Sequence, residues 1–356
     1  MRLVMAGGGT GGHLFPGLAV AREFQRRDAG TEILFVGSEW GIERRVVPQE
    51  GFSLKVLPIR GIKGRGIRGL TEALYSVPLS LFRSLGIIGR FQPECIIGLG
   101  GYASAPFLLA GTMKRIRCAI MEQNLRPGLT NRFLGWMVDR IFTTYEESTA
   151  FFRRSKVIET GTPVRWQGLP KVNGRDKFTL FVFGGSAGAH RINVCVLDAL
   201  ERLVDLASGL CVVHQTGEAD LASVQHTYSS LPFESEVLPF IEQMDLAYAR
   251  ADLIVCRAGA STVAEITIFG KAAILIPYPY AAYDHQRWNA QALRASGAAE
   301  MILDQELSGE RLAELIRALY LDRRRLEAMG KAAGKLGRPE AAKRIVDECY
   351  ALLRCP

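Results

Sequence analysis

Short apolar runs alternate along the chain with longer segments in which apolar residues recur at helical spacing. In the first half, the apolar runs cover residues 2–6, 33–36, 54–57, 95–99, 118–121 and 140–144. In the second half, they cover residues 179–183, 211–214, 237–239, 253–256, 273–276 and 299–303. Continuous apolar strands that alternate with helices are typical of a parallel sheet covered on both faces. The pattern therefore predicts an α/β protein with two doubly wound domains.

A stretch that contains several prolines and glycines, residues 161–176, lies between the two halves. We expect it to be the interdomain linker, since 356 residues are the natural length for two domains. The first domain is expected to cover residues 1–162 and the second residues 163–337. The charged segment that ends the chain has a helical pattern, and we expect a C-terminal helix at about residues 338–356 that packs back on the first domain.

Each half opens with a strand that runs directly into glycines. Residues 7–13 are GGGTGGH, and residues 184–189 are GGSAGA. Glycines after a strand let the backbone turn tightly and approach a phosphate, and the helix that follows offers free N–H groups. Two such turns, about one domain apart, predict two nucleotide-type domains that face one cleft.

The first turn also fits the G-x-G-x-x-G pattern of dinucleotide-binding proteins. That pattern requires an acidic residue about 20 positions further on, at the end of the second strand. Here the nearest candidate, Glu39, lies later than that. His13 directly follows the turn, at the start of a helix, where a neutral imidazole is well suited to act as a general base. The alternative is a histidine that only caps or packs.

The net charge of +8 comes from the first half, whereas the second half is mildly acidic. A basic half fits a phosphate-bearing substrate, an anionic lipid or nucleic acid, and equally a solvated surface. The seven cysteines include no Cys-x-x-Cys pair, and several lie inside apolar runs, as buried thiols of a reducing compartment do. Because the chain opens on a core strand, we expect no signal peptide and a cytoplasmic location.

The segment 73–91 is rich in leucine, isoleucine and phenylalanine, and it follows the basic residues Arg60, Lys63, Arg65 and Arg68. It is too short and too charged to span a bilayer, which needs about 20 apolar residues. Taken alone, the segment is better explained as a core helix after a basic loop. The alternative is a helix that lies on an anionic membrane surface.

Six further motifs occur in the chain. They are GLGGY (98–102), EQN (122–124), GTPVR (161–165), HQTG (214–217), AGASTVAE (258–265) and DHQRWNA (284–290). Together with the two glycine turns, in this order and over almost the whole chain, they closely resemble the MurG family, the bacterial N-acetylglucosaminyltransferases that make lipid II. Two departures, Tyr283 before the last motif and Leu125-Arg126 after EQN, concern only fine contacts.

The resemblance implies the GT-B fold, two Rossmann-like domains with the sugar donor in the cleft between them. It implies transfer of GlcNAc from UDP-GlcNAc to the C4 hydroxyl of the muramyl sugar of lipid I, with inversion to a β linkage. The implied partners are these two substrates and the anionic cytoplasmic face of the membrane, where the enzyme is peripheral. No nucleic acid, cofactor or metal is implied. The segment 73–91 then becomes a candidate for the membrane contact.

The resemblance also implies roles for individual residues. His13 is the expected base that takes the proton of the acceptor. Substrate contacts are expected from Thr10, Gly11, Gly12, Asn124, Arg165, Ser186, Ile241, Ala260, Ser261, Thr262, Val263, Ala264, Glu265 and Gln286, with Asn289 as a further candidate. Among these, Ser186 with the 184–188 backbone is expected to bind the pyrophosphate, Glu265 the ribose hydroxyls and the backbone of Ile241 the uracil. Asn124, Ala260 and Gln286 are expected at sugar hydroxyls, and Arg165 at the hinge near the nucleotide.

Each role has a structural alternative: Ser186 as a helix cap, Glu265 as support for its helix, Asn124 as a turn residue. Three rival functions also fit parts of the pattern. A UDP-GlcNAc 2-epimerase shares the fold, but it needs no lipid surface. A nicotinamide dehydrogenase would need the acidic residue described above, and its absence at the required position in this chain counts against that function. The third rival is a nucleotide-sugar-binding protein without activity. His13→Ala separates it from an enzyme, because in an enzyme binding should survive the change while turnover drops about 10²-fold or more.

Overall fold

The computed structural model describes residues 1–59, 66–166, 168, 170 and 176–354, and of residues 66–74 it describes the backbone only. The chain divides into two compact units, Met1–Arg165 with Arg338–Pro356, and Trp166–Gly337. The sequence places the borders between 162 and 163 and between 337 and 338, so the first border differs by three residues. Arg60, Lys63 and Arg65, and the side chain of Arg68, lie outside the described residues.

The first unit contains a seven-stranded parallel sheet in the order β3-β2-β1-β4-β5-β6-β7. Its strands are β1 (Arg2–Gly7), β2 (Glu32–Ser38), β3 (Ser53–Leu57), β4 (Cys95–Gly100), β5 (Arg117–Glu122), β6 (Arg140–Thr143) and β7 (Val157–Glu159). Its helices are α1 (Gly11–Arg27), α2 (Glu43–Gln49), α3 (Gly66–Phe91), α4 (Ser104–Met113), α5 (Leu129–Leu134) and α13 (Ala341–Arg354), with short 3-10 turns at Glu146–Phe151 and Arg154–Lys156.

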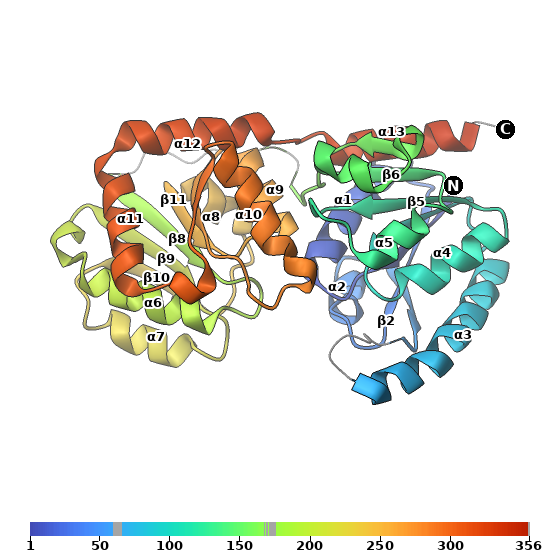
Figure 1. Cartoon of the computed structure of the whole chain (residues 1–356), viewed down its shortest axis with the longest axis horizontal. Coiled ribbons are helices and arrows are strands. Elements are labelled where there is room, and N and C mark those ends of the chain that lie inside the picture. Colours follow the sequence, from blue (N-terminus) through green and yellow to red (C-terminus); the bar gives the residue numbers. More distant parts are fainter. Residues whose placement is uncertain (60–65, 167, 169, 171–175, 355–356) are drawn as a thin grey trace. The chain divides into compact units, whose positions relative to one another are not determined.

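Apolar side chains fill both faces of this sheet. On one face, α1, α2 and α13 cover a core that includes Leu18, Phe24 and Ile345. On the other face, α3, α4 and α5 cover a second core around Phe107 and Leu134. The last helix, α13, thus belongs to the first unit, where it lies beside α1 (Figure 1).

The second unit contains a six-stranded parallel sheet in the order β10-β9-β8-β11-β12-β13. Its strands are β8 (Phe178–Phe183), β9 (Leu210–Gln215), β10 (Glu234–Leu238), β11 (Leu253–Cys256), β12 (Ala272–Leu275) and β13 (Ala299–Met301). Its helices are α6 (His190–Glu201), α7 (Leu221–Tyr228), α8 (Met244–Arg250), α9 (Ala260–Phe269), α10 (His285–Ala295), α11 (Gly309–Leu321) and α12 (Arg323–Leu336), with 3-10 turns at Val204–Leu206, Ala282–Asp284 and Asp304–Glu306.

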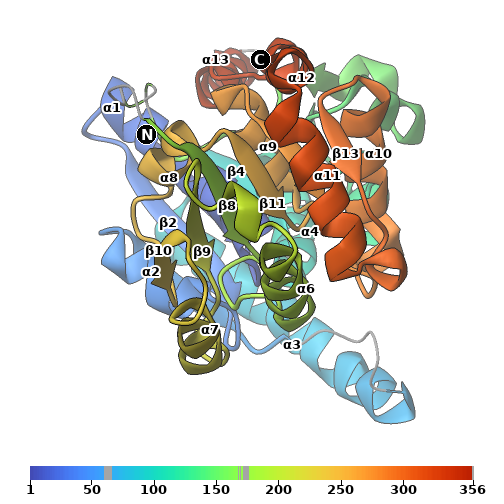
Figure 2. The same cartoon turned by 90° about the vertical axis from the view of Figure 1, so that its left-hand side faces the viewer.

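Helices cover both faces of this sheet as well. One core lies under α6, α7 and α11, and α11 runs beside α6 (Figure 2). The other core lies under α8, α9 and α10 and contains a cluster of aromatic rings around Tyr248.

All of the predicted strands are confirmed, and the structure adds one that the sequence pattern does not predict. The extra strand, β7, has only three residues at the sheet edge, which is too short for an apolar run. At the other sheet's edge, β10 begins three residues before the predicted run. Those residues, Glu234, Ser235 and Glu236, are exposed polar residues of an edge strand, so they carry no apolar signal.

The helix predicted at 73–91 is confirmed as the main part of α3, which has 26 residues. Among the side chains described on this helix, from residue 75 onward, four large apolar ones are exposed, and Tyr75 and Phe82 are exposed by 80 % and 78 %. Their exposure favours the surface-contact interpretation of this helix over that of an ordinary core helix. Within the part of the chain that the structure describes, no helix combines the length and the apolar character that a membrane crossing requires.

Candidate functional site

Each sheet has one point at which the strand order reverses. In the first unit it lies between β1 and β4, and in the second between β8 and β11. Ligands of doubly wound sheets bind beyond the carboxyl ends of the strands at such points. The loops that leave these four strands are the two glycine turns, the GLGGY motif and the segment before α9. The sequence motifs therefore lie where the topology favours a binding site in each unit.

A buried carboxylate holds the first glycine turn in place. Glu43, in the first turn of α2, is 1 % exposed. Its Oε2 accepts a hydrogen bond from the Gly9 amide at 2.8 Å, and its Oε1 accepts from the amide and hydroxyl of Ser38 at 2.7 and 3.0 Å. A Cβ atom at position 37 or 41 would collide with the Glu43 side chain, so glycine at both positions leaves room for it. Sequence reasoning missed Glu43, for which the two preceding glycines, Gly37 and Gly41, were a weak signal.

This arrangement changes what the first glycine turn can bind. The Gly9 amide is used by Glu43, and the Gly8 amide donates to the carbonyl of Gly100 at 3.1 Å. Neither amide is left to bind a phosphate, and a carboxylate lies directly beneath the turn. The first half of this turn therefore does not offer its amides to a phosphate in the way that the dinucleotide-binding pattern requires. Thr10 is the N-cap residue of α1, but its side chain makes no capping hydrogen bond.

His13 lies in the first turn of α1, between the loops that follow β4 and β5. Its Nδ1 is 3.3 Å from Oε1 of Gln123. Its ring packs against Gly100, where a Cβ atom would lie 2.8 Å from Nδ1. Arg165 lies near the same helix, because its guanidinium is 4.1 Å from the centre of the Phe15 ring, a cation–π contact.

Asn124 belongs to a buried polar network. The carboxyl group of Glu122 accepts hydrogen bonds from the Asn124 amide at 3.0 Å, from its side chain at 3.2 Å, and from Nδ2 of Asn131 at 2.9 Å. Burial raises the pKa of Glu122, and these hydrogen bonds oppose the rise. The network fixes the loop after β5, so Asn124 is both a turn residue, as its structural alternative states, and a candidate for substrate contact.

In the second unit, the glycine turn after β8 differs from the first glycine turn in its contacts and in where the next helix begins. Ser186 is exposed, and α6 begins later, at His190, with Ala189 as its N-cap residue. The proposal that Ser186 is only a helix cap is therefore wrong. Nε2 of Gln215 donates to the carbonyl of Gly185 at 2.9 Å. In the part of the chain that the structure describes, no carboxylate accepts a hydrogen bond from residues 184–188, which suits an anionic ligand better than the first turn does.

Glu265 lies in the second turn of α9 and is 7 % exposed. The hydroxyl of Tyr248 donates to its Oε2 at 2.7 Å, and the Tyr248 ring lies within the aromatic cluster of the second core. This contact orients the carboxylate from the side of the core. The sequence gives no signal for it, because Tyr248 belongs to a different helix.

The remaining predicted residues of the second unit differ in accessibility. Ala260, Val263, Ala264 and Ile241 have buried side chains, and the Val263 amide donates to the carbonyl of Gly259, the N-cap residue of α9. Only their backbone could meet a ligand. The first three residues of α9, Ala260, Ser261 and Thr262, have amides that a helix start leaves outside the intrahelical pattern. These three residues are the better placed part of the AGASTVAE motif.

Gln286 joins two loops at the carboxyl edge of the second sheet. Its Oε1 accepts from the Ala258 amide at 3.2 Å and from the Tyr278 amide at 2.9 Å. Its amide nitrogen is then the group that can donate to a sugar. Asn289 is fully buried and donates to the Ala258 carbonyl at 3.3 Å, so its observed contact is structural.

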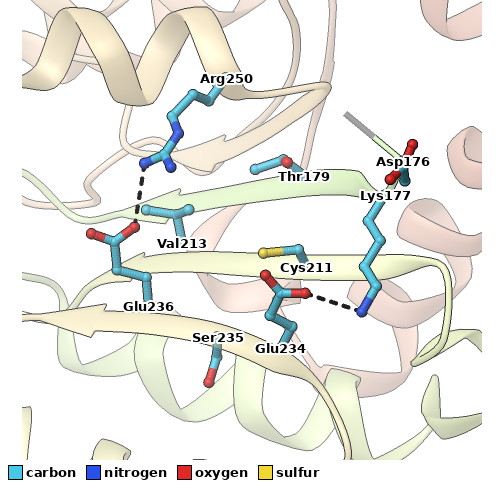
Figure 3. Close-up of a pocket in the computed structure, with 9 residues that line it drawn as sticks. All are labelled: Asp176, Lys177, Thr179, Cys211, Val213, Glu234, Ser235, Glu236 and Arg250. Carbon is cyan, nitrogen blue, oxygen red and sulfur yellow. Dashed lines mark hydrogen bonds and ion pairs between the residues drawn. The ribbon is translucent and has the colours of Figure 1, made fainter. Parts of the chain in front are cut away.

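A hollow of about 420 Å³ lies elsewhere on the second unit (Figure 3). It is bordered by the first residues of β8, β9 and β10 and by two ion pairs, Lys177–Glu234 and Arg250–Glu236. These are the amino-terminal ends of the strands, opposite to the end at which doubly wound sheets bind ligands. None of the predicted site residues lines it. The cleft expected between the units stays a prediction.

Comparison with known proteins gives the class of the chain. The model of the glycosyltransferase family 28 N-terminal domain matches residues 3–143, and the model of its C-terminal domain matches residues 179–345. The chain thus has the two domains of a family 28 glycosyltransferase in their usual order.

Individual relatives narrow this class. The chain is 48 % identical to a Myxococcus xanthus protein named UDP-N-acetylglucosamine--N-acetylmuramyl-(pentapeptide) pyrophosphoryl-undecaprenol N-acetylglucosamine transferase, over 99 % of this chain and 93 % of that protein. It resembles the crystal structure of Acinetobacter baumannii MurG with a TM-score of 0.79 and 30 % identity, over 98 % of this chain and 99 % of that one. The chain belongs to the MurG family and has the GT-B fold.

A UDP-GlcNAc 2-epimerase from Neisseria meningitidis has the same fold, with a TM-score of 0.70 over 99 % of this chain and all of that one. Its identity to this chain is only 14 %. The likeness to the epimerase therefore concerns the fold alone, whereas the likeness to the MurG family extends to the sequence.

Proposed function

We propose that this chain transfers GlcNAc from UDP-GlcNAc to the C4 hydroxyl of the muramyl sugar of lipid I and so makes lipid II. The observation that carries this conclusion is the 48 % identity, over nearly the whole length, to a relative whose name states this transfer. The ordered motifs, and their position at the strand-order reversals of both sheets, support it.

The donor is assigned to the second unit. The exposed Ser186 and the turn around it suit the pyrophosphate, because this turn leads into the start of α6, which favours an anion. Asp220 lies at the same helix start, where it is bonded to the side chains of His190 and Asn193. The Glu265 carboxylate, oriented by Tyr248, suits the two ribose hydroxyls, since a carboxylate accepts from both. The amide nitrogen of Gln286 suits a hydroxyl of the sugar.

The chemistry is a single displacement. The acceptor oxygen forms a bond to C1 of GlcNAc while the bond from C1 to the UDP oxygen breaks, which inverts the configuration to β. His13 takes the proton of the acceptor hydroxyl as general base. The negative charge that develops on UDP is stabilised by the helix starts and hydroxyls of the second unit. The described residues contain no cluster of three or more potential metal ligands, and we propose that transfer needs no metal.

The acceptor carries a lipid, and α3 offers a surface that suits a membrane. Tyr75, Val77, Leu79 and Phe82 are exposed on this helix, and the side chain of Arg83 is half exposed among them. An exposed apolar surface with basic residues binds anionic membranes peripherally. We therefore place the enzyme at the cytoplasmic face of the cell membrane.

The transfer is tested with radiolabelled UDP-GlcNAc and a short-chain lipid I analogue in the presence of EDTA, with UDP-GalNAc as the parallel donor. We expect label in the lipid product from UDP-GlcNAc alone. Conversion of UDP-GlcNAc to its 2-epimer without transfer would support the epimerase instead. The His13→Ala variant is expected to bind UDP-GlcNAc normally and to turn over about 10²-fold more slowly; unchanged turnover would remove His13 from the mechanism.

A further inference from the structure

Gln123 occupies a position that none of the roles above uses. It directly follows β5, and its side chain is 2 % exposed. Its amide group bridges two other loops of the first unit. Nε2 donates to the carbonyl of Leu99 at 3.3 Å, and Oε1 lies 3.3 Å from Nδ1 of His13. The bridge thus joins the ends of β4 and β5 to the first turn of α1.

The chemistry of the partners fixes the orientation of this amide. A backbone carbonyl can only accept hydrogen bonds, so the nitrogen of the amide must face Leu99. The reversed orientation would bring two oxygen atoms together. The oxygen of the amide therefore faces His13, and an oxygen without a hydrogen can only accept. It follows that Nδ1 of His13 carries the hydrogen atom.

The tautomer decides what the other ring nitrogen can do. In a neutral imidazole, one nitrogen donates and the other accepts, and the partner of one determines the state of the other. With the hydrogen on Nδ1, the lone pair of His13 lies on Nε2. The contact of the ring with Gly100, which has φ +98° and no room for a Cβ atom, holds the ring in the same place.

We propose that Gln123 is a positioning residue that holds His13 in the Nδ1–H tautomer and so keeps Nε2 ready to accept a proton. This role corresponds to that of the aspartate in serine protease triads, which orients a catalytic histidine through Nδ1. Gln123 differs because its amide is neutral, so it orients the imidazole without adding a negative charge. The catalytic meaning of the tautomer rests on the proposed function; the tautomer itself does not.

The tautomer is measured directly by long-range ¹H–¹⁵N correlation spectra of protein labelled with ¹⁵N-histidine. The chain has five histidines, and the His13 signals are assigned from their absence in His13→Gln. Two other histidines serve as references. His285 has Nδ1 at 2.6 Å from the Ala282 carbonyl and must donate from Nδ1. His214 has Nε2 at 3.1 Å from Oδ1 of Asn193 and must donate from Nε2.

We expect His13 to show the Nδ1–H pattern of His285 in the wild-type protein. Gln123→Met removes the oxygen, and His13 should then shift toward the Nε2–H form, which free imidazole side chains favour. Gln123→Glu keeps an oxygen that accepts from Nδ1–H, so His13 should retain its hydrogen on Nδ1, even though the donor to the Leu99 carbonyl is lost. An Nε2–H pattern in the wild-type protein, or an unchanged Nδ1–H pattern in Gln123→Met, would overturn the proposal.

Kinetics add the second readout. Gln123→Met should lower kcat by roughly tenfold to a hundredfold, as expected when a general base is weakened, and should change KM for UDP-GlcNAc by less than twofold. The matched control is Gln225→Met, the same change at an exposed position of α7 in the second unit, which should leave both constants unchanged. Equal kcat values for wild-type and Gln123→Met protein would overturn the catalytic role of Gln123. A wild-type protein with the expected tautomer but without transfer would contradict the proposed function instead.

Discussion

Replacing Glu43 with glutamine changes one buried oxygen atom to an amino group beneath the first glycine turn. Every hydrogen bond shown for the carboxyl group is donated to it, by the Gly9 amide and by the amide and hydroxyl of Ser38. Glutamine has only one oxygen. If this oxygen stays with the two Ser38 donors, the new amino group faces the Gly9 amide, and two donors meet.

The cost of Glu43→Gln can be estimated from these contacts. One hydrogen bond to a charged group, of the kind seen at 2.8 Å to Gly9, contributes about 1.5–3 kcal/mol, and a buried donor left unsatisfied costs a similar amount. We expect a loss of about 2–3 kcal/mol in the free energy of unfolding of the first unit. Ser38→Ala is the matched control, because it removes only the hydroxyl donor and should cost about 1 kcal/mol.

The assay combines urea unfolding with hydrogen exchange of the amides in residues 7–12. Exchange in this segment should accelerate in Glu43→Gln and stay slow in Ser38→Ala, where the Gly9 contact remains. Because this turn leads into His13, we also expect kcat to fall roughly tenfold. Equal stability and equal exchange in the glutamine variant and the wild-type protein would refute the assignment of Glu43 as the support of the turn.

Three further predictions concern other parts of the chain. Burial lowers the pKa of His214 to about 3, so the folded state favours the neutral imidazole. The free energy of unfolding should therefore fall by up to about 1.4 kcal/mol per pH unit as the pH drops from 6.5 toward 3. In urea unfolding, His214→Gln should lack this contribution to the pH dependence. Glu265→Gln should raise the Kd of UDP at least roughly tenfold by calorimetry, since a charged acceptor is lost; an unchanged Kd would contradict the ribose role. The double variant Tyr75→Ser/Phe82→Ser should bind anionic vesicles at least roughly tenfold more weakly in a sedimentation assay. Tyr280→Ser changes an equally exposed residue of the second unit and should bind normally. Equal losses of vesicle binding in the two variants would argue against a specific membrane surface on α3.

The sequence predicted the architecture well because its signals are local. Buried parallel strands are continuous apolar runs, and the glycine turns directly follow β1 and β8. The failures are local as well: β7 is too short for a pattern, and the start of β10 is polar because it is an exposed edge. The exposure of Phe82 could not be predicted, since an apolar helix has the same composition whether or not another element covers it.

The supports of the site were harder to predict because they act across the chain. Gln123 contacts a histidine 110 positions earlier, and Glu43 holds a glycine 34 positions away. Tyr248 orients Glu265 from a neighbouring helix. Such pairs have no spacing rule, since only the folded sheet brings the strand ends together. Gln123 lies within the EQN motif, but the motif does not indicate which distant residue its side chain contacts, and Glu43 and Tyr248 lie in none of the motifs.

The most direct test of the central claim is the configuration of the new glycosidic bond. The purified protein is given UDP-GlcNAc and a short-chain lipid I analogue in EDTA, and the anomeric proton of the transferred GlcNAc is examined by NMR. A single displacement at C1 predicts a β-linked GlcNAc on the C4 oxygen of the muramyl sugar. An α-linked product, or GlcNAc on another oxygen, would contradict the account.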